Sequence, residues 1–571
     1  MNRFSLLAPA LLAANGVLGA KWIGEVKKVD GLNYQCKCCT DNSRWPTNKD
    51  WEKLNKTVDS TLQVAVPPGA VCHKTFGNSS SVYDAAKCAD TQANWGNEQW
   101  PTDHPIANLW PFGTNNTCLP TSDPSEPCTR GFYGNYVIVA RTKDHIKVGV
   151  DFARERNLRL IIRNTGHDCM GRSTGFGSLI VNTHSFKDVK FIAKYGGPSD
   201  WTGMAATVGA SVQGRELFRQ ALHRAQSNCT TEITTFADLK QTVGWAGGYI
   251  QSIGADNVLS FDTIIAKGEY VTANAKEHPD LYWALKGGGP SSFAVVTSIT
   301  VKTFPEIPTA STIVNINSTH TNDTELFAKA VKIFHNLSNH YANNGMFVYF
   351  ELGPGPQRLH IAPFVGPNMD EAKLNTVLKP FFDQLDAAKV PCDKHTKSFP
   401  TFFDFYFDMF EDEPLNQQSI IGGRLFTQAD ITANGDKSAD ALIMAAMPEP
   451  TQLSFNVGHI VNPGPGVPQA DNAINPTWRN ASSFVITNVI MSGTESWAVN
   501  KERESFNTNV IGKALRDVSP NGASYVNEGD LYEPNWQQAY WGSKYARLLQ
   551  IRQKYDPDGV FYTQIAPGTE N

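Results

Sequence analysis

A histidine, an aspartate and an arginine stand within one short glycine-rich stretch that follows an apolar run. The stretch, RNTGHDCMGRSTGFG, covers residues 163–177, and the apolar run covers residues 158–162. Glycine lets the backbone approach a bound group closely. His167 on such a loop suits a general base, a metal ligand or a nucleophile that bonds to a cofactor. The structural alternative is a loop histidine hydrogen-bonded to Asp168.

Two of these chemistries lack their partners in the neighbouring sequence. A metal site needs more ligands than the residues around His167 supply. A Ser-His-Asp triad needs a nucleophile elbow, which this stretch does not contain. A neutral imidazole that attacks an activated cofactor carbon remains open.

Small residues also gather in two further stretches, residues 244–248 and 287–292. Such backbone can crowd its N–H groups around an anion such as a pyrophosphate. No stretch is a P-loop, because no Gly-Lys-[Ser/Thr] follows, and none fits G-x-G-x-x-G between a strand and a helix. Three stretches in one part of the chain favour a large cofactor that carries phosphate.

The elements before the histidine predict how it is positioned. Residues 136–140 read as a buried strand, Thr142 can cap a helix, and residues 158–162 read as a second buried strand. This β-α-β unit brings the loop to a strand end, where α/β folds usually bind ligands. Short strands are expected further on at residues 178–181, 205–208, 258–265 and 293–301, with a short helix at 280–285.

Pro305 and Pro308 mark a boundary, after which the pattern changes. Helices are expected at residues 324–341 and 369–387, and an aromatic strand at 346–352. A helix is expected at 541–555, near the C-terminus.

The N-terminus is typical of an export signal. Arg3 precedes a short apolar stretch, residues 4–18, and the small residues Gly19 and Ala20 follow. The rival interpretation is a cytosolic protein with an apolar start. Secretion is supported by N-glycosylation sequons at Asn55, Asn78, Asn115, Asn228, Asn317, Asn322, Asn336 and Asn480. No later segment has the length and apolarity of a membrane span.

Cysteines concentrate in the first quarter of the chain, at Cys36, Cys38, Cys39, Cys72, Cys88, Cys118 and Cys128. Disulfides in this irregular segment are expected, with pairs that the sequence does not assign. A zinc site is disfavoured because CKCC is not a familiar zinc spacing and no pair of histidines follows. The net charge of −5 gives no basic footprint for nucleic acid.

The loop from Arg163 through Gly166-His167-Asp168 to Gly171-Arg172-Ser173 resembles the flavin-anchoring segment of the vanillyl-alcohol-oxidase (PCMH-type) superfamily. The berberine-bridge-enzyme-like branch is the most similar, particularly secreted fungal oxidases of the isoamyl-alcohol-oxidase type. Further matching stretches lie at residues 207–213, 280–296, 525–528 and 540–557.

The resemblance implies FAD bonded covalently to His167. It implies that the cofactor is bound by Arg163, Gly166, His167, Asp168, Gly171, Arg172, Ser173, Thr242, Val243, Gly244 and Gly248. Tyr525 is the implied catalytic base, although a packing aromatic is the alternative, and Asn527 is expected to contact flavin or substrate. Valine at the position of Val243 implies access for dioxygen as electron acceptor. No metal is implied.

Two departures from the family pattern matter. Many relatives carry a second flavin-anchoring cysteine just before the Thr-Val-Gly step, but here Lys240 and Gln241 precede Thr242. Cys229 lies further upstream and is interpreted as a loop or disulfide residue, so a single bond to FAD is predicted. The loop after Gln251 is also shorter than in relatives, which raises a third possibility, a secreted relative that has lost catalysis.

The expected fold is α+β and two-lobed, with a PCMH-type FAD-binding domain and an antiparallel-sheet substrate domain. Expected divisions are a signal peptide (1–20), a Cys-rich segment on the outside (21–129), the FAD domain (130–309), the substrate domain (310–524) and a segment that returns to the FAD lobe (525–571). The expected activity is oxidation of a small-molecule alcohol or related C–H donor by a monomeric secreted enzyme. Oxidation of a carbohydrate is the alternative activity.

Overall fold

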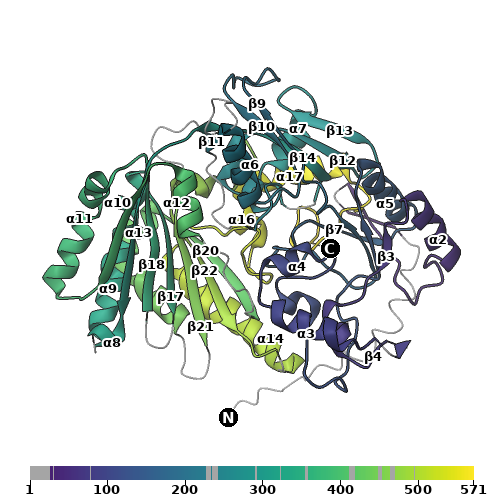
Figure 1. Ribbon diagram of the computed structural model, residues 1–571, viewed down its shortest axis with the longest axis horizontal. Coiled ribbons are helices and arrows are strands. Elements are labelled where there is room, and N and C mark those ends of the chain that lie inside the picture. Colours follow the sequence, from purple (N-terminus) through teal and green to yellow (C-terminus); the bar gives the residue numbers. More distant parts are fainter. Residues whose placement is uncertain are drawn as a thin grey trace, which may run out of the picture.

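Two lobes lie side by side in the computed structural model (Figure 1). The structure describes residues 26–29, 31–77, 79–80, 82–226, 233–234, 242–289, 292–321, 323–353, 358–410, 418–447, 453–462, 470–493 and 496–570. One lobe holds the N-terminal half and the C-terminal segment, and the other holds most of residues 309–518. The expected α+β class with an antiparallel-sheet domain is confirmed.

The predicted β-α-β unit supplies two strands, β6 and β7, of a four-stranded sheet ordered β3-β6-β8-β7. Strands β6 (Tyr136–Val139) and β7 (Arg159–Arg163) each run parallel to β8 (Ser178–Asn182). Helix α5 (Lys143–Glu155) joins β6 to β7, and the Thr142 hydroxyl caps it by accepting from the His145 N–H. The loop that carries His167 therefore leaves the end of a buried parallel strand, as predicted.

The Cys-rich segment contributes an edge strand and an outer helix to the first lobe. Its strand β3 (Leu62–Val64) pairs antiparallel with β6. Its helix α2 (Asn48–Thr57) places Trp51 against Tyr136, with ring centroids 4.0 Å apart. Its remaining elements are β1 (Lys27–Val29), β2 (Leu32–Tyr34), β4 (Thr75–Phe76), β5 (Ser79–Ser80), α3 (Ala85–Asn94), α4 (Gln99–Asp103) and the 3₁₀ turns η1 (Pro68–Cys72) and η2 (Pro111–Thr114).

Two of the expected disulfides are present in this segment, Cys72–Cys88 and Cys118–Cys128. Cys36, Cys38 and Cys39 are free thiols. His73 lies within 4.8 Å of the sulfurs of Cys118 and Cys128. The disulfide takes up both thiols and the His73 ring nitrogens face the carbonyl oxygens of Leu119 and Glu126, so this cluster has no ligand set for a metal.

A five-stranded antiparallel sheet completes the first lobe. Its order is β13 (Tyr270–Asn274), β12 (Val258–Ile265), β14 (Ala294–Lys302), β10 (Ala205–Gly209) and β9 (Val189–Ile192). The C-terminal helices α16 (Trp536–Trp541) and α17 (Tyr545–Tyr555) return to this lobe, and Trp541 and Leu548 join its core. Other elements here are α6 (Gly214–Gln226), α7 (Pro279–Leu285), η3 (Gly248–Gln251), η4 (Ile253–Asn257), η7 (Gly542–Lys544), and β11 (Ile233–Thr234) paired with β15 (Phe304–Pro305).

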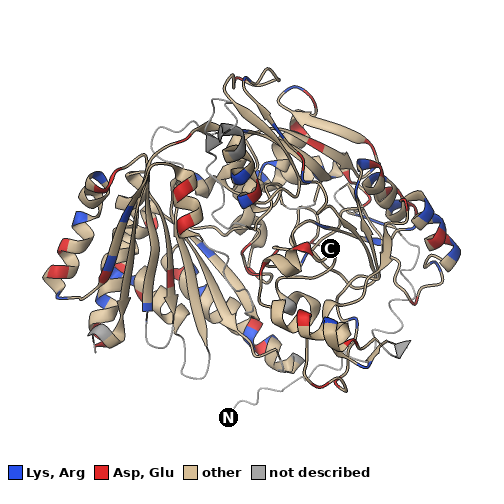
Figure 2. Ribbon diagram, viewed as in Figure 1, with Lys and Arg blue, Asp and Glu red and all other residues tan. Residues whose placement is uncertain are grey.

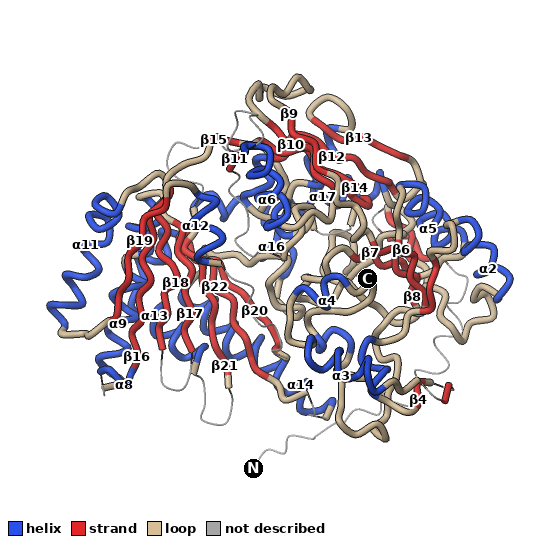
Figure 3. The backbone as a smooth tube through the Cα atoms, viewed as in Figure 1, coloured by secondary structure: helices blue, strands red, loops and turns tan. Residues whose placement is uncertain are grey.

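The second lobe is built on a seven-stranded antiparallel sheet, visible as the long red segments on the left of Figure 3. Its order is β19 (Asp393–Phe399), β16 (Thr309–Asn317), β18 (Arg358–Pro367), β17 (Phe347–Gly353), β21 (Ser454–Ile460), β22 (Ala481–Ile490) and β20 (Ser419–Thr427). Its helices are α8 (Ser318–Thr321), α9 (Thr324–Asn336), α10 (Ser338–Asn343), α11 (Glu371–Ala388), α12 (Phe402–Met409), α13 (Gln428–Ala446), α14 (Trp497–Phe506), the π-helical turn η6 (Asn507–Ile511) and α15 (Gly512–Val518), with the 3₁₀ turn η5 (Pro476–Asn480).

Alternation along the strands separates the two faces of this sheet. Phe350, Ile460 and Val485 pack into one core with helices α9, α11 and α13. Phe484, next to Val485 in the chain, packs instead with Tyr525 and Ala255 of the first lobe. Because successive strand residues point to opposite faces, one face is covered by helices and the other faces the first lobe.

No helix among the described residues has the combination of length and apolarity that crossing a membrane requires. Acidic and basic residues are interspersed along the outer helices α2, α5 and α11 (Figure 2).

Candidate active site

The backbone of the loop between β7 and β8 comes close to another segment. Gly166 and Gly171 have φ values of +84° and +75°, a region that favours glycine. A Cβ on Gly171 would lie 3.1 Å from the Cα of Gly113, which belongs to the turn η2. The glycines of this loop are therefore required by close packing as well as by backbone conformation.

Arg163 lies beneath this loop and is fully buried. Its guanidinium donates to the carbonyl oxygens of Pro101 (2.6 Å), Ala107 (3.0 Å) and Asn164 (3.0 Å). Burial lowers its pKa to about 9. The guanidinium thus holds residues 101–107 under the loop. This geometry favours a role for Arg163 in positioning the site over a role in direct binding of a cofactor.

His167 faces two side chains that are distant in the sequence. Its Nε2 lies 3.0 Å from Thr242 Oγ1 and 3.2 Å from Glu98 Oε1. Its Nδ1 is buried and has no hydrogen-bond partner among the described residues. The structural alternative, a bond between His167 and Asp168, is not what the structure shows. Nε2 therefore has hydrogen-bond partners within the protein, whereas Nδ1 is left available to a bound group.

Asp168 and Arg172 form a pair within the loop. The Arg172 Nη2 and Nε donate to Asp168 Oδ2 at 2.6 and 3.0 Å, and the Arg172 backbone N–H donates to Asp168 Oδ1. The same guanidinium reaches the carbonyl oxygens of Val526 and Ile565 in the C-terminal segment. Ser173 follows and is buried. This pair therefore fastens the loop to the end of the chain.

The second predicted cofactor segment, Thr242 to Gly248, runs beside the loop. The carbonyl oxygen of Thr242 accepts from Gln213 Nε2 (2.7 Å), and that of Val243 accepts from the Gly214 N–H (3.0 Å). A Cβ on Gly244 would lie 3.1 Å from Asn164 Nδ2, next to the loop. Thr242 and Gly244 thus lie beside the first segment, and their contact with the cofactor stays a prediction. Lys240, Gln241 and Cys229 lie outside the described residues.

Tyr525 has a different setting from the one expected of a base. Its hydroxyl donates to the carbonyl oxygen of Gly248 (2.8 Å), and the residue is 5% exposed. Its ring packs edge-on against Trp478 and Phe484, with centroids 5.6 and 5.7 Å away. The structure favours the alternative, a packing aromatic that joins the two lobes. Asn527 retains a buried Oδ1 with no partner among the described residues.

Two polar side chains that the sequence analysis did not single out lie on the sheet face toward the first lobe. Tyr349 of β17 pairs in register with His459 of β21, which pairs in turn with Phe484. Paired residues in an antiparallel sheet point to the same face. The Tyr349 and His459 rings are 5.3 Å apart. The alternation of residues along each strand could have predicted which sheet face Tyr349 and His459 occupy. Their pairing could not be predicted, because it depends on contacts between strands that are distant in the sequence.

These two residues lie between the places where the lobes touch. On one side, Phe484 meets Tyr525. On the other side, Phe218 of α6 packs 4.7 Å from Tyr406 of α12, in a cluster that also contacts Phe347. Tyr349 and His459 therefore occupy the part of this face that lies between the two contacts with the first lobe.

The residues of the first lobe fit the expected FAD. The buried polar atoms of this region that have no partner among the described residues include His167 Nδ1, Asn108 Nδ2 and Asn527 Oδ1. The Asn108 amide lies beside Gly113, and Asn527 follows Val526, the partner of Arg172. Buried polar atoms are normally satisfied, so an unsatisfied set beside a glycine loop is the pattern expected where a polar ligand binds.

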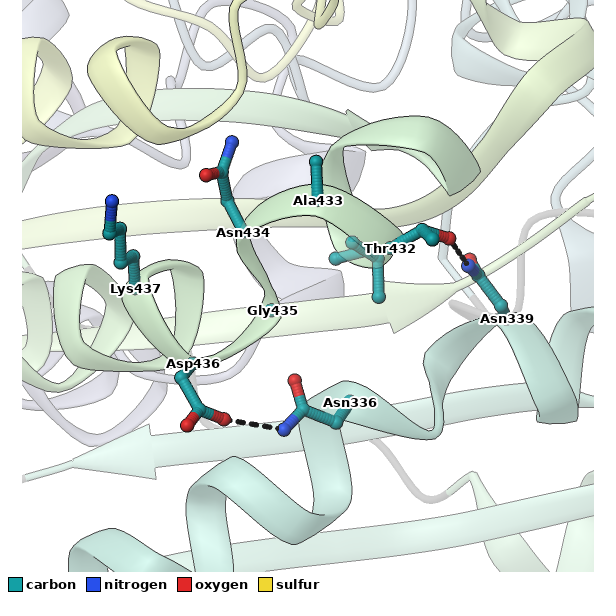
Figure 4. Close-up of a pocket in the computed structure, with 9 residues that line it drawn as sticks. Asn336, Asn339, Thr432, Ala433, Asn434, Gly435, Asp436 and Lys437 are labelled. Atoms are coloured by element: carbon teal, nitrogen blue, oxygen red, sulfur yellow. Dashed lines mark hydrogen bonds between the residues drawn. The ribbon is translucent and has the colours of Figure 1, made fainter.

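A surface pocket of about 500 Å³ lies elsewhere, at a kink in α13 (Figure 4). Asn434 breaks the helix there with φ −135° and ψ 24°. Asn336 Nδ2 donates to Asp436 Oδ1 (2.7 Å), and Asn339 Nδ2 donates to Thr432 Oγ1 (3.2 Å). The pocket belongs to the helix layer, on the opposite face of the sheet from Tyr349 and His459, and is not the candidate site. It contains the sequon asparagine Asn336.

Comparison with known proteins agrees with this geometry. A family profile described as "FAD binding domain" matches residues 135–274, and one described as "Berberine and berberine like" matches residues 524–565. The "FAD-linked oxidoreductase sor8" of Hypocrea jecorina is 32% identical over 95% of this chain and 92% of its own. The "VAO-type flavoprotein oxidase VAO615" of Thermothelomyces thermophilus is 29% identical over 94% and 93%.

Solved structures give the same result. The crystal structure of the VAO-type flavoprotein MtVAO615 from Myceliophthora thermophila has a TM-score of 0.85 at 27% identity and covers 94% of this chain and 98% of its own. A chitooligosaccharide oxidase shares the fold, with a TM-score of 0.61 at 15% identity over 85% and 99% of the two chains.

Proposed function

Because the chain belongs to the FAD-linked oxidoreductases that join an FAD-binding domain to a berberine-like C-terminal segment, we propose that it oxidises an alcohol or a related C–H donor and passes the electrons to dioxygen. The observation that carries the proposal is the environment of His167. This histidine stands on the glycine loop with one ring nitrogen held and the other buried without a partner among the described residues.

In this proposal each side chain has a definite task. His167 tethers FAD, and the backbone from Gly166 to Ser173, with Thr242 to Gly244, binds the rest of the cofactor. Bound FAD supplies the electron acceptor for a hydride from the substrate, and the protein supplies position and electrostatics. Tyr349 and His459 bind the donor group, and His459 takes the hydroxyl proton, because a histidine titrates near neutral pH.

Removal of the substrate hydroxyl proton by His459 is tested by steady-state kinetics. His459→Asn is expected to lower kcat by roughly a hundredfold or more, the contribution of a positioned acid–base group. Tyr525→Phe is the matched variant from the opposite side of the site. If His459→Asn turns over at the wild-type rate with the same pH profile, His459 is not the base.

Dioxygen as acceptor is supported by Val243, the residue type that resemblance links to oxygen access. Reoxidation of the reduced enzyme in aerated buffer is expected to be fast in stopped flow. Slow reoxidation by air with rapid reoxidation by a quinone would make the protein a dehydrogenase.

Secretion and glycosylation are part of the proposal. The N-terminal pattern and the sequons support them, and two disulfides are consistent with an oxidising compartment. Endoglycosidase treatment of protein from the culture medium is expected to lower its apparent mass. An unglycosylated protein retained inside the cell would contradict this.

The whole proposal is tested first by the visible spectrum of the purified protein and then by peroxide formation with a panel of donors. Oxidised flavin bands and peroxide with alcohols are expected. Turnover of oligosaccharides alone would favour carbohydrate oxidation, which is what the names of some structural neighbours state for those proteins. A protein with flavin bands that oxidises nothing in the panel would favour a relative that has lost catalysis.

A further inference from the structure

Glu98 is a buried carboxylate beside the proposed tether. It lies in the N-terminal segment, outside the two stretches that the family profiles match. Its Oε1 is 3.2 Å from His167 Nε2, and its side chain is 4% exposed. A carboxylate so deeply buried is uncommon unless it is paired. The motif that contains His167 does not include Glu98, so it does not account for this contact.

The segment around Glu98 is held firmly. Glu98 is the N-cap residue of α4, and its carbonyl oxygen accepts from Thr102 Oγ1 (2.9 Å). Arg163, in turn, donates to the carbonyl oxygen of Pro101 in the same helix. The residue that ends the buried strand thus fixes the helix that presents the carboxylate to the histidine of the same loop.

The contact fixes the state of the imidazole. An ionised carboxylate only accepts hydrogen bonds, so the Nε2 that faces Glu98 carries the hydrogen. In the neutral ring the other nitrogen, Nδ1, then holds a free lone pair. Nδ1 is the nitrogen that is buried without a partner among the described residues. Carboxylates orient histidines in this way in metal sites and in hydrolase triads.

We propose that Glu98 is a positioning residue for covalent attachment of FAD to His167, an inference that rests on the proposed tether. Glu98 keeps the lone pair of His167 Nδ1 available. It also stabilises the positive charge that develops on the imidazole ring as Nδ1 bonds to the 8α methyl carbon of the flavin. In the net reaction the imidazole N–H and one 8α C–H are lost and the N–C bond forms. The two hydrogens and two electrons reduce dioxygen to hydrogen peroxide, and the attached flavin ends oxidised.

The test measures covalent flavin in the full-length protein, independently of turnover. Wild type, Glu98→Gln and Glu98→Asp are purified in parallel, incubated with FAD in air, and precipitated with acid at intervals. Glu98→Gln keeps the size of the side chain and removes its charge. It is expected to bind flavin reversibly and attach it roughly a hundredfold more slowly. Glu98→Asp retains the charge on a shorter side chain, so its rate is expected between the two.

Asp103→Asn is the matched control. Asp103 ends the same helix, and its Oδ1 lies 3.0 Å from Nε2 of another histidine, His184. This variant removes a carboxylate–histidine contact from α4 without touching His167, so attachment at the wild-type rate is expected. If Asp103→Asn slows attachment as much as Glu98→Gln, the effect belongs to the stability of α4 and the proposal is wrong.

The remaining outcomes are distinguishable. Attachment in Glu98→Gln at the wild-type rate would overturn the role of Glu98 and leave the tether intact. A wild-type protein that releases all its flavin into acid would overturn the tether itself. If Glu98→Gln does not fold, Glu98→Asp decides: attachment slower than wild type, with unchanged total flavin, supports the proposal, and an unchanged rate overturns it.

Discussion

The guanidinium Nη2 of Arg172 and the carbonyl oxygen of Val526 are 2.6 Å apart, although 354 positions separate the two residues in the chain. Arg172 also holds Asp168 in its own loop. One side chain therefore joins the predicted flavin-binding loop to the segment that returns from the second lobe. The Arg172 guanidinium thus holds the loop against the C-terminal segment.

Loss of this connection is expected to destabilise the first lobe. Arg172→Met leaves the largely buried Asp168 carboxylate unpaired, and breaking such a pair costs about 3–5 kcal/mol. We expect a lower unfolding temperature and weaker flavin retention, measured by circular dichroism and flavin fluorescence. Arg159→Met is the control, because Arg159 makes an exposed bond to the carbonyl of Phe176. Equal destabilisation by both variants would contradict the role assigned to Arg172.

A single covalent bond to FAD is expected, through His167. Acid-precipitated wild-type protein should stay yellow, and a tryptic peptide that contains His167 should carry the mass of FAD. His167→Ala should release all its flavin on precipitation, whereas Cys229→Ala should release none. Flavin found on a peptide with Cys229 would show that a second anchor exists.

Crowding at Gly171 can be separated from backbone strain by comparing two alanine variants. Gly171 and Gly345 have nearly equal φ values of +75° and +72°, but a Cβ on Gly345 would have no atom within 4 Å. Gly345→Ala should therefore cost only the strain, about 1–2 kcal/mol. Gly171→Ala should add an overpacking cost of roughly 1–3 kcal/mol and reduce flavin content. Equal losses of unfolding free energy would show that the contact with Gly113 is unimportant.

Tyr525→Phe is expected to leave turnover within a few-fold of wild type. The variant removes one hydrogen bond to the Gly248 carbonyl, worth about 1 kcal/mol, and keeps the ring between Trp478 and Phe484. Steady-state kinetics and a thermal unfolding curve measure the two effects. A loss in kcat of roughly a hundredfold or more would restore Tyr525 as the base.

Acid is expected to destabilise the second lobe through His335. This residue is buried beside Phe426, and burial lowers its pKa from 6.5 to about 4. Between these values the unfolded chain binds a proton that the folded chain does not, so stability falls as the pH falls from 6.5 to 4. His335 contributes at most about 3 kcal/mol to this loss of folding stability.

His335→Gln should flatten this pH dependence of the unfolding temperature, whatever it does to stability at pH 8. His395, an exposed residue of β19, provides the control, and His395→Gln should leave the slope unchanged. A slope that is the same in wild type and His335→Gln would assign the acid sensitivity to other groups.

Local patterns were sufficient to predict the elements that carry the loop. The Thr142 cap, the helix after it and the flanking apolar runs all depend on residues near one another in sequence, and the structure has them within a residue or two. The long helix expected at residues 324–341 is divided into α9 and α10 at Leu337, a break that no proline or glycine marks.

The partners of His167 could not be predicted in the same way. Glu98 and Thr242 lie in segments brought together by the folding of the whole lobe, and neither forms a motif with the histidine. Tyr525 matched a family motif, but whether its hydroxyl was free depended on a carbonyl of Gly248 far along the chain. Motifs located the candidate site, whereas tertiary contacts determine which groups each of its side chains faces.

The groups around the cofactor loop come from distant parts of the polypeptide: Glu98, Thr242 and the carbonyls of Val526 and Ile565. A ribosome makes the chain from its N-terminus, so Val526 and Ile565 are made only after the whole seven-stranded sheet. A growing chain that has not reached these residues lacks two of the contacts that hold Arg172. We therefore expect flavin loading to follow synthesis of the second lobe, and a message cut short before the codon of Val526 to give a polypeptide that retains less flavin.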